Sequence, residues 1–242
     1  MDDSTKDWQE KEIGNKEIPD KEIPDKEMMN KEMMNKEKNE AEETGKKDER
    51  QITWHTMDIT REYREKLLGQ KAAVLWLTGL SGSGKSTLAN ALEQQLAAKG
   101  RHTMLLDGDN VRFGLNRDLG FSKEDRVENI RRIAETAKLM NDAGLIVLTS
   151  FISPYREDRL AARRIIGDAF IEIYVSTPLE ECERRDVKGL YQAARAGKIA
   201  EFTGVTSVYE APEHPEIMID TSKAGIEESV RSVLAGLEKY GI

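Results

Sequence analysis

The sequence contains a single cysteine, Cys182, so no disulfide can form within the chain. A lone cysteine fits a reducing compartment, and we expect a cytoplasmic protein. No apolar run is long enough to cross a bilayer, and the first residues are acidic, unlike a signal peptide. Basic residues do not dominate either, because the formal net charge is −8. The composition therefore argues against a membrane-spanning protein and against a nucleic-acid binder.

The first fifty residues are set apart by a five-residue repeat. Units of the form KEIGN, KEIPD and KEMMN follow one another from Lys11 to Asn35. A step of five residues turns a helix by about 500°, so the apolar positions form no stripe, and Pro19 and Pro24 would interrupt a helix. The segment carries a net charge of −6, which leaves about −2 for the rest. We predict a disordered arm over residues 1–50, or alternatively a short docking segment, and a folded domain over residues 51–242.

The most specific motif is GLSGSGKS at residues 79–86, directly after the apolar run Val74–Leu77. It fits the pattern G-x-x-x-x-G-K-[ST] of a phosphate-binding loop. Its glycines let backbone N–H groups turn toward phosphate oxygens. Lys85 is expected to bridge the β- and γ-phosphates of ATP, and the Ser86 hydroxyl to ligate Mg²⁺. The residues expected to bind the triphosphate are Gly79, Leu80, Ser81, Gly82, Ser83, Gly84, Lys85, Ser86 and Thr87.

Strand-like and helix-like segments alternate along the rest of the chain. Strands are expected at Val74–Thr78, Thr103–Leu106, Leu145–Thr149, Phe170–Val175 and Glu216–Ile219. Helices are expected after the phosphate loop and at Ser122–Ala143, Arg156–Ile166, Pro178–Arg185 and Ile226–Tyr240. Ser122 is a candidate helix cap, and Thr177 with Glu180 is typical of a capping box. Together with the phosphate loop, the alternation predicts a three-layer α/β fold of the P-loop NTPase type. Its mainly parallel sheet is expected to be covered by helices on both faces.

Polar clusters follow three of the expected strands. Asp107 and Asp109 end the second strand, residues 150–156 follow the third, and residues 184–191 lie beyond the fourth. Because ligands of parallel α/β sheets bind at the carboxyl ends of the strands, we expect these clusters to surround the phosphate loop.

A series of segments in this order resembles the adenylylsulfate kinase family. The matching segments are residues 79–87, 106–112, 114–122, 124–126, 128–132, 149–155, 188–191, 202–204 and 209–213. The resemblance covers the chain from about Ile52 to its C-terminus. It implies a kinase that uses Mg²⁺ and ATP to phosphorylate the 3′-hydroxyl of adenosine 5′-phosphosulfate, giving 3′-phosphoadenylylsulfate and ADP in sulfate assimilation.

The reaction suggests roles for the two aspartates. A ribose hydroxyl is a weak nucleophile, so it must be positioned in line with the γ-phosphate and helped to lose its proton. Asp109 is our candidate for the base, or for the group that orients this hydroxyl. Asp107 is a candidate for the acceptor site or for the Mg²⁺ shell together with Ser86.

The family resemblance also implies an acceptor site. Arg112, Arg126 and Asn129 would hold the phosphosulfate, and Phe121 and Phe202 would sandwich the adenine. Ile152 and Ser153 match the acceptor-side loop, and Ser153 resembles a serine recorded as a phosphorylated intermediate. An in-line transfer needs no such relay, so Ser153 is kept as a candidate active-site residue only.

Residues 184–206 are rich in Arg and Lys, contain three glycines and lack apolar periodicity. This composition, together with the resemblance, predicts a mobile lid in which Lys188 reaches the acceptor and Arg184 or Arg185 lies near ATP. Three positions depart from the family pattern. Phe113 replaces a usual His, Val187 replaces a usual Pro, and Val208 stands where Pro is common.

Two alternatives to this enzyme remain open. One is a kinase of the same fold for another small hydroxyl acceptor, such as a sugar acid. The other is a nucleotide-binding regulatory protein that acts through the repeat arm. The resemblance further implies a homodimer and a separate ATP sulfurylase that supplies the substrate.

Overall fold

Five parallel strands form the central sheet, in the order β2-β3-β1-β4-β5. The strands are β1 (Ala73–Thr78), β2 (Thr103–Asp107), β3 (Ile146–Ser150), β4 (Phe170–Val175) and β5 (Ile217–Ile219). All five were predicted, and no strand end differs from its predicted position by more than one residue. Every residue of β1 is buried, as expected for the middle strand of a sheet that is covered on both faces.

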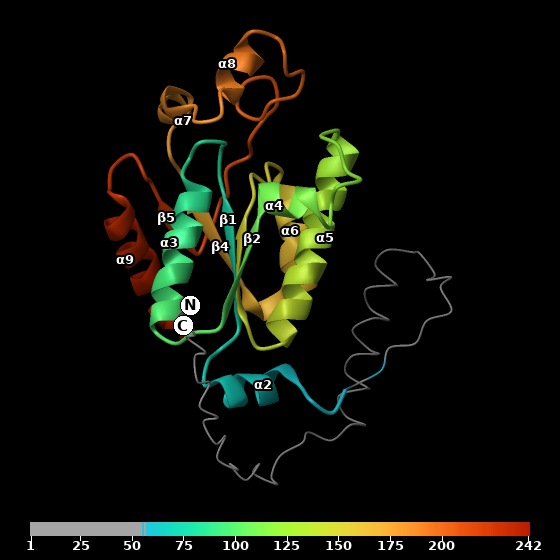
Figure 1. Ribbon diagram of the computed structural model, residues 1–242, viewed down its shortest axis with the longest axis vertical. Coiled ribbons are helices and arrows are strands. Elements are labelled where there is room, and N and C mark those ends of the chain that lie inside the picture. The colour runs from blue at the N-terminus through green and yellow to red at the C-terminus, as the bar shows by residue number, and fades with distance from the viewer. Residues whose placement is uncertain (1–54, 56) are drawn as a thin grey trace, which may run out of the picture. The chain divides into compact units, whose positions relative to one another are not determined.

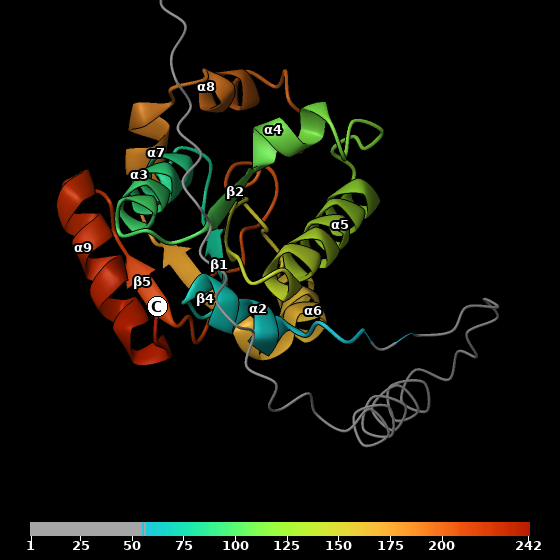
Figure 2. The ribbon, with the colours of Figure 1, turned by 60° about the horizontal axis from the view of Figure 1, so that its bottom comes forward.

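Two pairs of helices cover the sheet. In the computed structural model, α3 (Lys85–Ala98) and α9 (Ile226–Leu237) lie on one face, and α5 (Lys123–Asp142) and α6 (Arg156–Ile166) on the other (Figures 1 and 2). Side chains of β1 alternate between two apolar cores. Leu75 and Leu77 belong to the core under α3 and α9, whereas Val74 and Trp76 belong to the core under α5 and α6. The predicted three-layer fold is confirmed.

Two predicted helix caps can be compared with the N-termini of the helices in the structure. Ser122 caps α5 as predicted, since its hydroxyl accepts a hydrogen bond from the Asp125 backbone N–H at 3.1 Å. The capping box at Thr177 is wrong. The helix α7 (Leu179–Arg185) begins with Pro178 as its cap, and the Thr177 hydroxyl instead donates to the Ser83 carbonyl at 3.0 Å. Thr177 therefore ties α7 to the phosphate loop.

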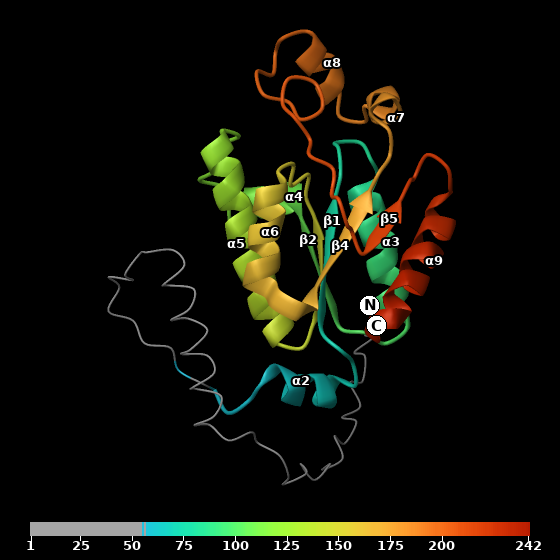
Figure 3. The same cartoon turned by 180° about the vertical axis from the view of Figure 1, so that it is seen from behind.

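Within the described residues, three further α-helices were not predicted. They are α2 (Arg61–Leu68), α4 (Gly108–Phe113) and α8 (Leu190–Arg195). Each has only six to eight residues, which is too short for an apolar period to stand out. Both α7 and α8 lie beyond the carboxyl ends of the strands. The helix α2 lies near the opposite, amino-terminal ends of the strands (Figures 1 and 3).

The structure describes His55 and residues 57–242. Ile59–Ile242 form one unit, and Met1–Asp58 are grouped as another. The repeat arm predicted for residues 1–50 lies outside the described residues and stays a prediction. Among the described residues, no helix is both long enough and apolar enough to cross a membrane.

Candidate active site

The phosphate loop joins β1 to α3 and holds Lys85 in a buried position. Lys85 is 8% exposed, and its ammonium group donates a hydrogen bond to the Leu80 carbonyl at 2.7 Å. Gly82 has φ = 73°, and a Cβ built there would lie 2.9 Å from the Cys182 carbonyl oxygen. Glycine is therefore required at this position for both backbone conformation and space. The loop keeps a cation at the place where phosphates are expected.

Burial changes the acidity of this cation. Removal from water disfavours the charged form and lowers the pKa of Lys85 to about 8. Bound phosphates would favour the charged form and raise this pKa again, so nucleotide binding takes up a proton above pH 8.

We therefore expect the affinity for ATP to fall as the pH rises through about 8. Calorimetric titration of ATP from pH 6.5 to 9.5 measures this dependence. Lys85→Arg is the matched control, because a guanidinium stays charged over the whole range and should give a flatter profile. A wild-type profile as flat as that of Lys85→Arg would contradict the assignment.

Ser86 and Asp107 form a pair suited to a hard cation. The Ser86 hydroxyl donates to Asp107 Oδ2 at 2.7 Å and lies 3.1 Å from the Ser150 hydroxyl oxygen. One hydroxyl and one carboxylate are the kind of ligands that Mg²⁺ takes from proteins, with phosphates and water completing the shell. Within His55 and residues 57–242, no group of three or more His, Cys, Asp and Glu side chains could bind a metal alone. The pair fits a cation that arrives with a nucleotide.

Asp109 lies beside this pair, at the start of α4. Asp107 caps α4 by accepting a hydrogen bond from the Asp109 backbone N–H at 3.1 Å, which fixes the chain direction there. The Asp109 carboxylate forms an ion pair with Lys188. Both side chains are more than half exposed, so the pair is open to solvent and to substrate. Two residues predicted from separate segments are thus in contact.

Arg112, Phe121 and Arg126 form a second cluster. The Arg112 guanidinium lies 4.5 Å from the Phe121 ring centroid and donates to the Gly120 carbonyl at 2.8 Å. Arg126 donates to the Phe121 carbonyl at 2.8 Å and to the Thr203 hydroxyl at 3.0 Å. Phe121 is 65% exposed, so one of the predicted aromatic residues is free to meet a ligand.

Two further residues predicted for the acceptor site, Phe202 and Asn129, are buried. Phe202 is 8% exposed and packs edge-on against Tyr191, with ring centroids 4.9 Å apart. Asn129 accepts a hydrogen bond from the Asn116 side-chain amide at 3.0 Å. Phe202 directly precedes Thr203, so Arg126 connects the Phe121 segment with the Phe202 segment. The structure thus brings the predicted aromatic segments to one place through Arg126, although each ring has a different partner.

Ser153 belongs to the acceptor-side loop, and its side chain is buried. Its hydroxyl donates to the Thr78 hydroxyl at 3.0 Å and accepts from the Trp76 indole at 3.3 Å. Its φ of 39° is unusual for a residue other than glycine, at a cost of about 1–3 kcal/mol. The neighbouring Ile152 carbonyl accepts from Thr78 at 2.8 Å. The hydroxyl is thus engaged in the core rather than presented to a phosphate.

We expect Ser153→Ala to keep turnover within about tenfold of wild type while losing about 1–3 kcal/mol of stability, since Trp76 loses its partner. Steady-state kinetics and thermal unfolding measure the two effects. Ser232→Ala, which removes only an exposed hydroxyl bonded to Glu228, is the control for stability. Complete loss of turnover in a folded Ser153→Ala protein would instead support a covalent relay.

The predicted lid contains its own small apolar core. Its buried members are Tyr191, Ala194 and Phe202, together with Cys182 of α7, which lies just before the lid. The Tyr191 hydroxyl donates to the Ser81 carbonyl of the phosphate loop at 2.9 Å. Although this segment is short on apolar periodicity, α8 buries Tyr191 and Ala194. Its mobility stays a prediction.

The two arginines at the end of α7 differ in position. Arg185 donates to the Thr221 hydroxyl at 2.9 Å and to the Thr221 carbonyl at 3.0 Å, next to the phosphate loop. Arg184 is 74% exposed and pairs with Glu181 on the surface. Thr87 is exposed in the first turn of α3. Of the two arginines, Arg185 is thus the one in contact with the loop side of the site.

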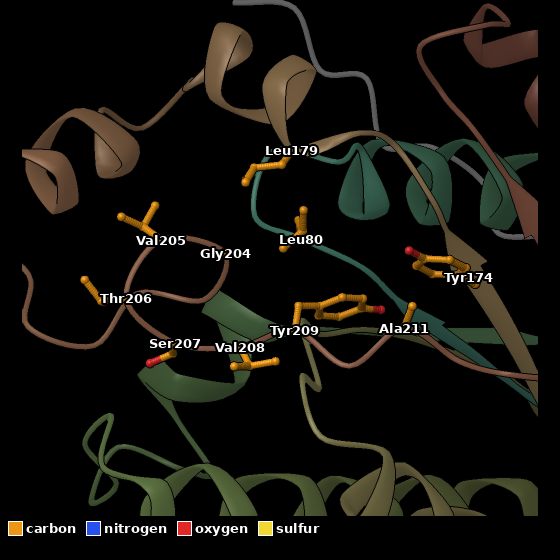
Figure 4. Close-up of a pocket in the computed structure, with 10 residues that line it drawn as sticks. All are labelled: Leu80, Tyr174, Leu179, Gly204, Val205, Thr206, Ser207, Val208, Tyr209 and Ala211. Carbon is orange, nitrogen blue, oxygen red and sulfur yellow. The ribbon is translucent and has the colours of Figure 1, made fainter.

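The described part of the chain also contains a cavity of about 440 Å³ beside the phosphate loop. Leu80 and Leu179 lie on one side and Gly204 and Val205 on the other, with Tyr209 below (Figure 4). None of its lining side chains is charged. The cavity is therefore unsuited to a triphosphate, which fits the loop itself better.

Residues 71–220 match the family model described as adenylylsulphate kinase. The chain belongs to the adenylylsulphate kinase family. The predicted family is confirmed.

This member of the adenylylsulphate kinase family covers different shares of its relatives. The chain is 56% identical over 190 residues to an adenylyl-sulfate kinase of Staphylococcus epidermidis, covering 78% of this chain and 96% of that protein. It is 64% identical over 171 residues to the bifunctional enzyme NodQ of Rhizobium meliloti, covering 70% of this chain but only 27% of that protein. It thus spans about a quarter of the bifunctional relatives and nearly all of the shorter ones.

One solved relative carries ligands. The APS kinase CysC of Mycobacterium tuberculosis in complex with AMPPNP and APS is 47% identical, with a TM-score of 0.67, and covers 70% of this chain and 99% of that one. A sugar kinase from Janibacter, 20% identical with a TM-score of 0.51, shares the fold alone.

Several residues of the site were missed from the sequence. Thr221 follows β5, so the rule that directed attention to the other strand ends would have found it. Thr78 ends β1 and was available to the same rule. Tyr191 was noted only as part of a motif, and its hydrogen bond to Ser81 had no signal in the sequence.

Proposed function

We propose that this chain transfers the γ-phosphoryl group of ATP to the 3′-hydroxyl of adenosine 5′-phosphosulfate. The observation that carries the proposal is the contact between Asp109 and Lys188 next to the Ser86–Asp107 pair. It supports a role for the Asp109 carboxylate beside the phosphate loop and a role for Lys188 toward the acceptor. The ligands of the CysC structure, AMPPNP and APS, are those expected for such a site.

The residues would divide the work between donor and acceptor. The loop and Lys85 would hold the β- and γ-phosphates, with Arg185 on the same side. Arg112, Arg126 and Asn129 would hold the phosphosulfate, and Phe121 and Phe202 the adenine. Asp109 would accept or orient the proton of the 3′-hydroxyl, releasing Lys188 toward the acceptor. Closure of residues 184–206 would exclude water, which otherwise competes as phosphoryl acceptor.

Ser86 and Asp107 would hold Mg²⁺, which neutralises charge on the transferring phosphoryl group when bound. The departures from the family pattern leave these groups intact. Phe113 and Val187 are each 87% exposed and Val208 is 66% exposed. None of the three replaces a group assigned to phosphoryl transfer.

A panel of acceptors tests the proposal. The protein is incubated with Mg·ATP and, separately, with adenosine 5′-phosphosulfate, gluconate or no acceptor, and products are identified by mass and by the position of the new phosphate. We expect one added phosphate at the 3′-oxygen of the adenylylsulfate only. Phosphorylated gluconate would favour the sugar-acid alternative, and ATP binding with no acceptor-dependent product would favour the regulatory alternative.

Assembly and context form a further part of the proposal. We expect a homodimer in the cytoplasm and a separate sulfurylase as the source of substrate. The second activity implied by the word bifunctional in the NodQ name would lie in the part of that enzyme beyond the aligned segment. Light scattering of the full chain measures the oligomeric state directly.

A further inference from the structure

Arg159 is a buried cation outside the groups assigned above. It lies on α6, is 3% exposed, and its guanidinium donates three short hydrogen bonds. The acceptors are Glu172 Oε1 at 2.8 Å, the Ser153 carbonyl at 2.7 Å and the Glu210 carbonyl at 2.7 Å. One side chain thus connects β4, the acceptor-side loop and the segment that follows the predicted lid.

Stability alone does not explain such a residue. A buried ion pair contributes little net stability over a well-packed apolar side chain, because both charges lose water. Desolvation raises the pKa of Glu172 despite its contact with Arg159, which reflects this cost. What the guanidinium does supply is geometry, since its rigid fork can fix two carbonyl groups in space at once.

The two carbonyl groups belong to segments that need fixing. Ser153 has the left-handed φ described above, a conformation that persists only where surrounding contacts hold it. The Glu210 N–H donates to the Pro154 carbonyl at 2.9 Å, and the Tyr209 hydroxyl lies 2.9 Å from the Thr78 hydroxyl oxygen. The acceptor-side loop and the segment after the lid are therefore bonded to each other, with Arg159 bonded to both.

We propose that Arg159 is a positioning residue for the acceptor site. By holding the Ser153 and Glu210 carbonyls, it keeps the Ile152–Ser153 turn and the segment that follows the lid in a fixed relative position. The inference rests on the proposed function, since these segments are taken to face adenosine 5′-phosphosulfate. It assigns Arg159 no contact with either substrate.

The same helix offers a matched control one turn away. Arg163 makes two 2.8 Å hydrogen bonds to Glu216 and lies over the Phe170 ring at 4.5 Å. Arg163 is thus an arginine of α6 whose carboxylate partner, Glu216, lies outside the acceptor-side loop. A merely structural role for Arg159 predicts that Arg159→Lys lowers stability without a selective rise in the KM for adenosine 5′-phosphosulfate.

The experiment compares Arg159→Lys with Arg163→Lys in the full chain. Lysine keeps the positive charge beside Glu172, but one ammonium group cannot reach all three acceptors. For Arg159→Lys, we expect the KM for adenosine 5′-phosphosulfate to rise about tenfold or more, because small displacements of a binding group are costly. The KM for ATP should stay within about twofold, and Arg163→Lys should leave both constants within about twofold.

A second measurement does not depend on turnover. The Trp76 indole is bonded to the Ser153 hydroxyl, so its fluorescence reports on the acceptor-side loop. In a chain with Trp8→Phe and Trp54→Phe, Arg159→Lys should shift the emission of Trp76, and Arg163→Lys should not.

The outcomes separate the two levels of the proposal. A wild-type chain without turnover of adenosine 5′-phosphosulfate overturns the proposed function, and the fluorescence comparison then decides whether Arg159 holds the loop. An active wild type with Arg159→Lys indistinguishable from Arg163→Lys overturns the positioning role. So does a rise of the KM for ATP equal to that for the acceptor.

Discussion

Replacing Asp109 with asparagine is expected to lower turnover by about 10²- to 10⁴-fold, the usual contribution of a positioned proton acceptor. Asparagine keeps the size and the hydrogen-bonding reach of the side chain but cannot take a proton from a ribose hydroxyl. The helix cap at Asp107 is unaffected, so α4 should keep its place. Steady-state turnover with saturating Mg·ATP and adenosine 5′-phosphosulfate measures the loss.

Asp168→Asn is the matched control for this change. Asp168 pairs with Arg61 at 3.2 Å and lies outside the candidate site. Its replacement should leave turnover unchanged. The affinity of Asp109→Asn for ATP should also stay close to wild type, since Asp109 is assigned to the acceptor. Turnover of Asp109→Asn within about threefold of wild type would remove Asp109 from the mechanism.

Replacing Lys85 with alanine is expected to lower kcat by about 10²- to 10³-fold, the typical cost of removing one group that stabilises charge in a transition state. By contrast, the Lys85→Ala protein should be at least as stable as the wild type. Burial lowers the pKa of Lys85 to about 8, so below that pH the folded protein holds a charge that it would hold more easily when unfolded. We expect the melting temperature of the ligand-free variant to stay unchanged or rise.

Lys99→Ala, at the other end of α3, is the control, because Lys99 is exposed and lies outside the phosphate loop. It should change neither kcat nor the response to ATP. The diagnostic pattern is a Lys85→Ala protein that is folded, thermally stable and almost inactive. A variant that unfolds would mean that the Lys85–Leu80 hydrogen bond supports the loop more than its buried charge destabilises it.

The sheet and the phosphate loop could be predicted from the sequence because both depend on local patterns. Apolar runs of four to six residues gave the five strands, and GLSGSGKS fixed the turn between β1 and α3. Because ligands of parallel α/β sheets bind at the carboxyl ends of the strands, Asp107, Asp109 and Lys188 were predicted to lie close together there. In the structure, Asp109 and Lys188 are in contact.

The surroundings of the site could not be predicted in this way. No sequence feature indicates that the ring of Phe202 packs edge-on against Tyr191. The partners of Ser153 come from β1, about 75 residues earlier in the chain. The three acceptors of Arg159 come from three separate segments. Such contacts depend on tertiary packing, which no local period or spacing encodes.

The most direct test of the central claim is ADP formation from Mg·ATP with and without adenosine 5′-phosphosulfate, with the nucleotide product identified by mass. We predict ADP formation that depends on the acceptor and matches 3′-phosphoadenylylsulfate mole for mole in the wild type, with almost none in Lys85→Ala. ADP formation that is equal with and without the acceptor, or absent in both cases, would contradict the account.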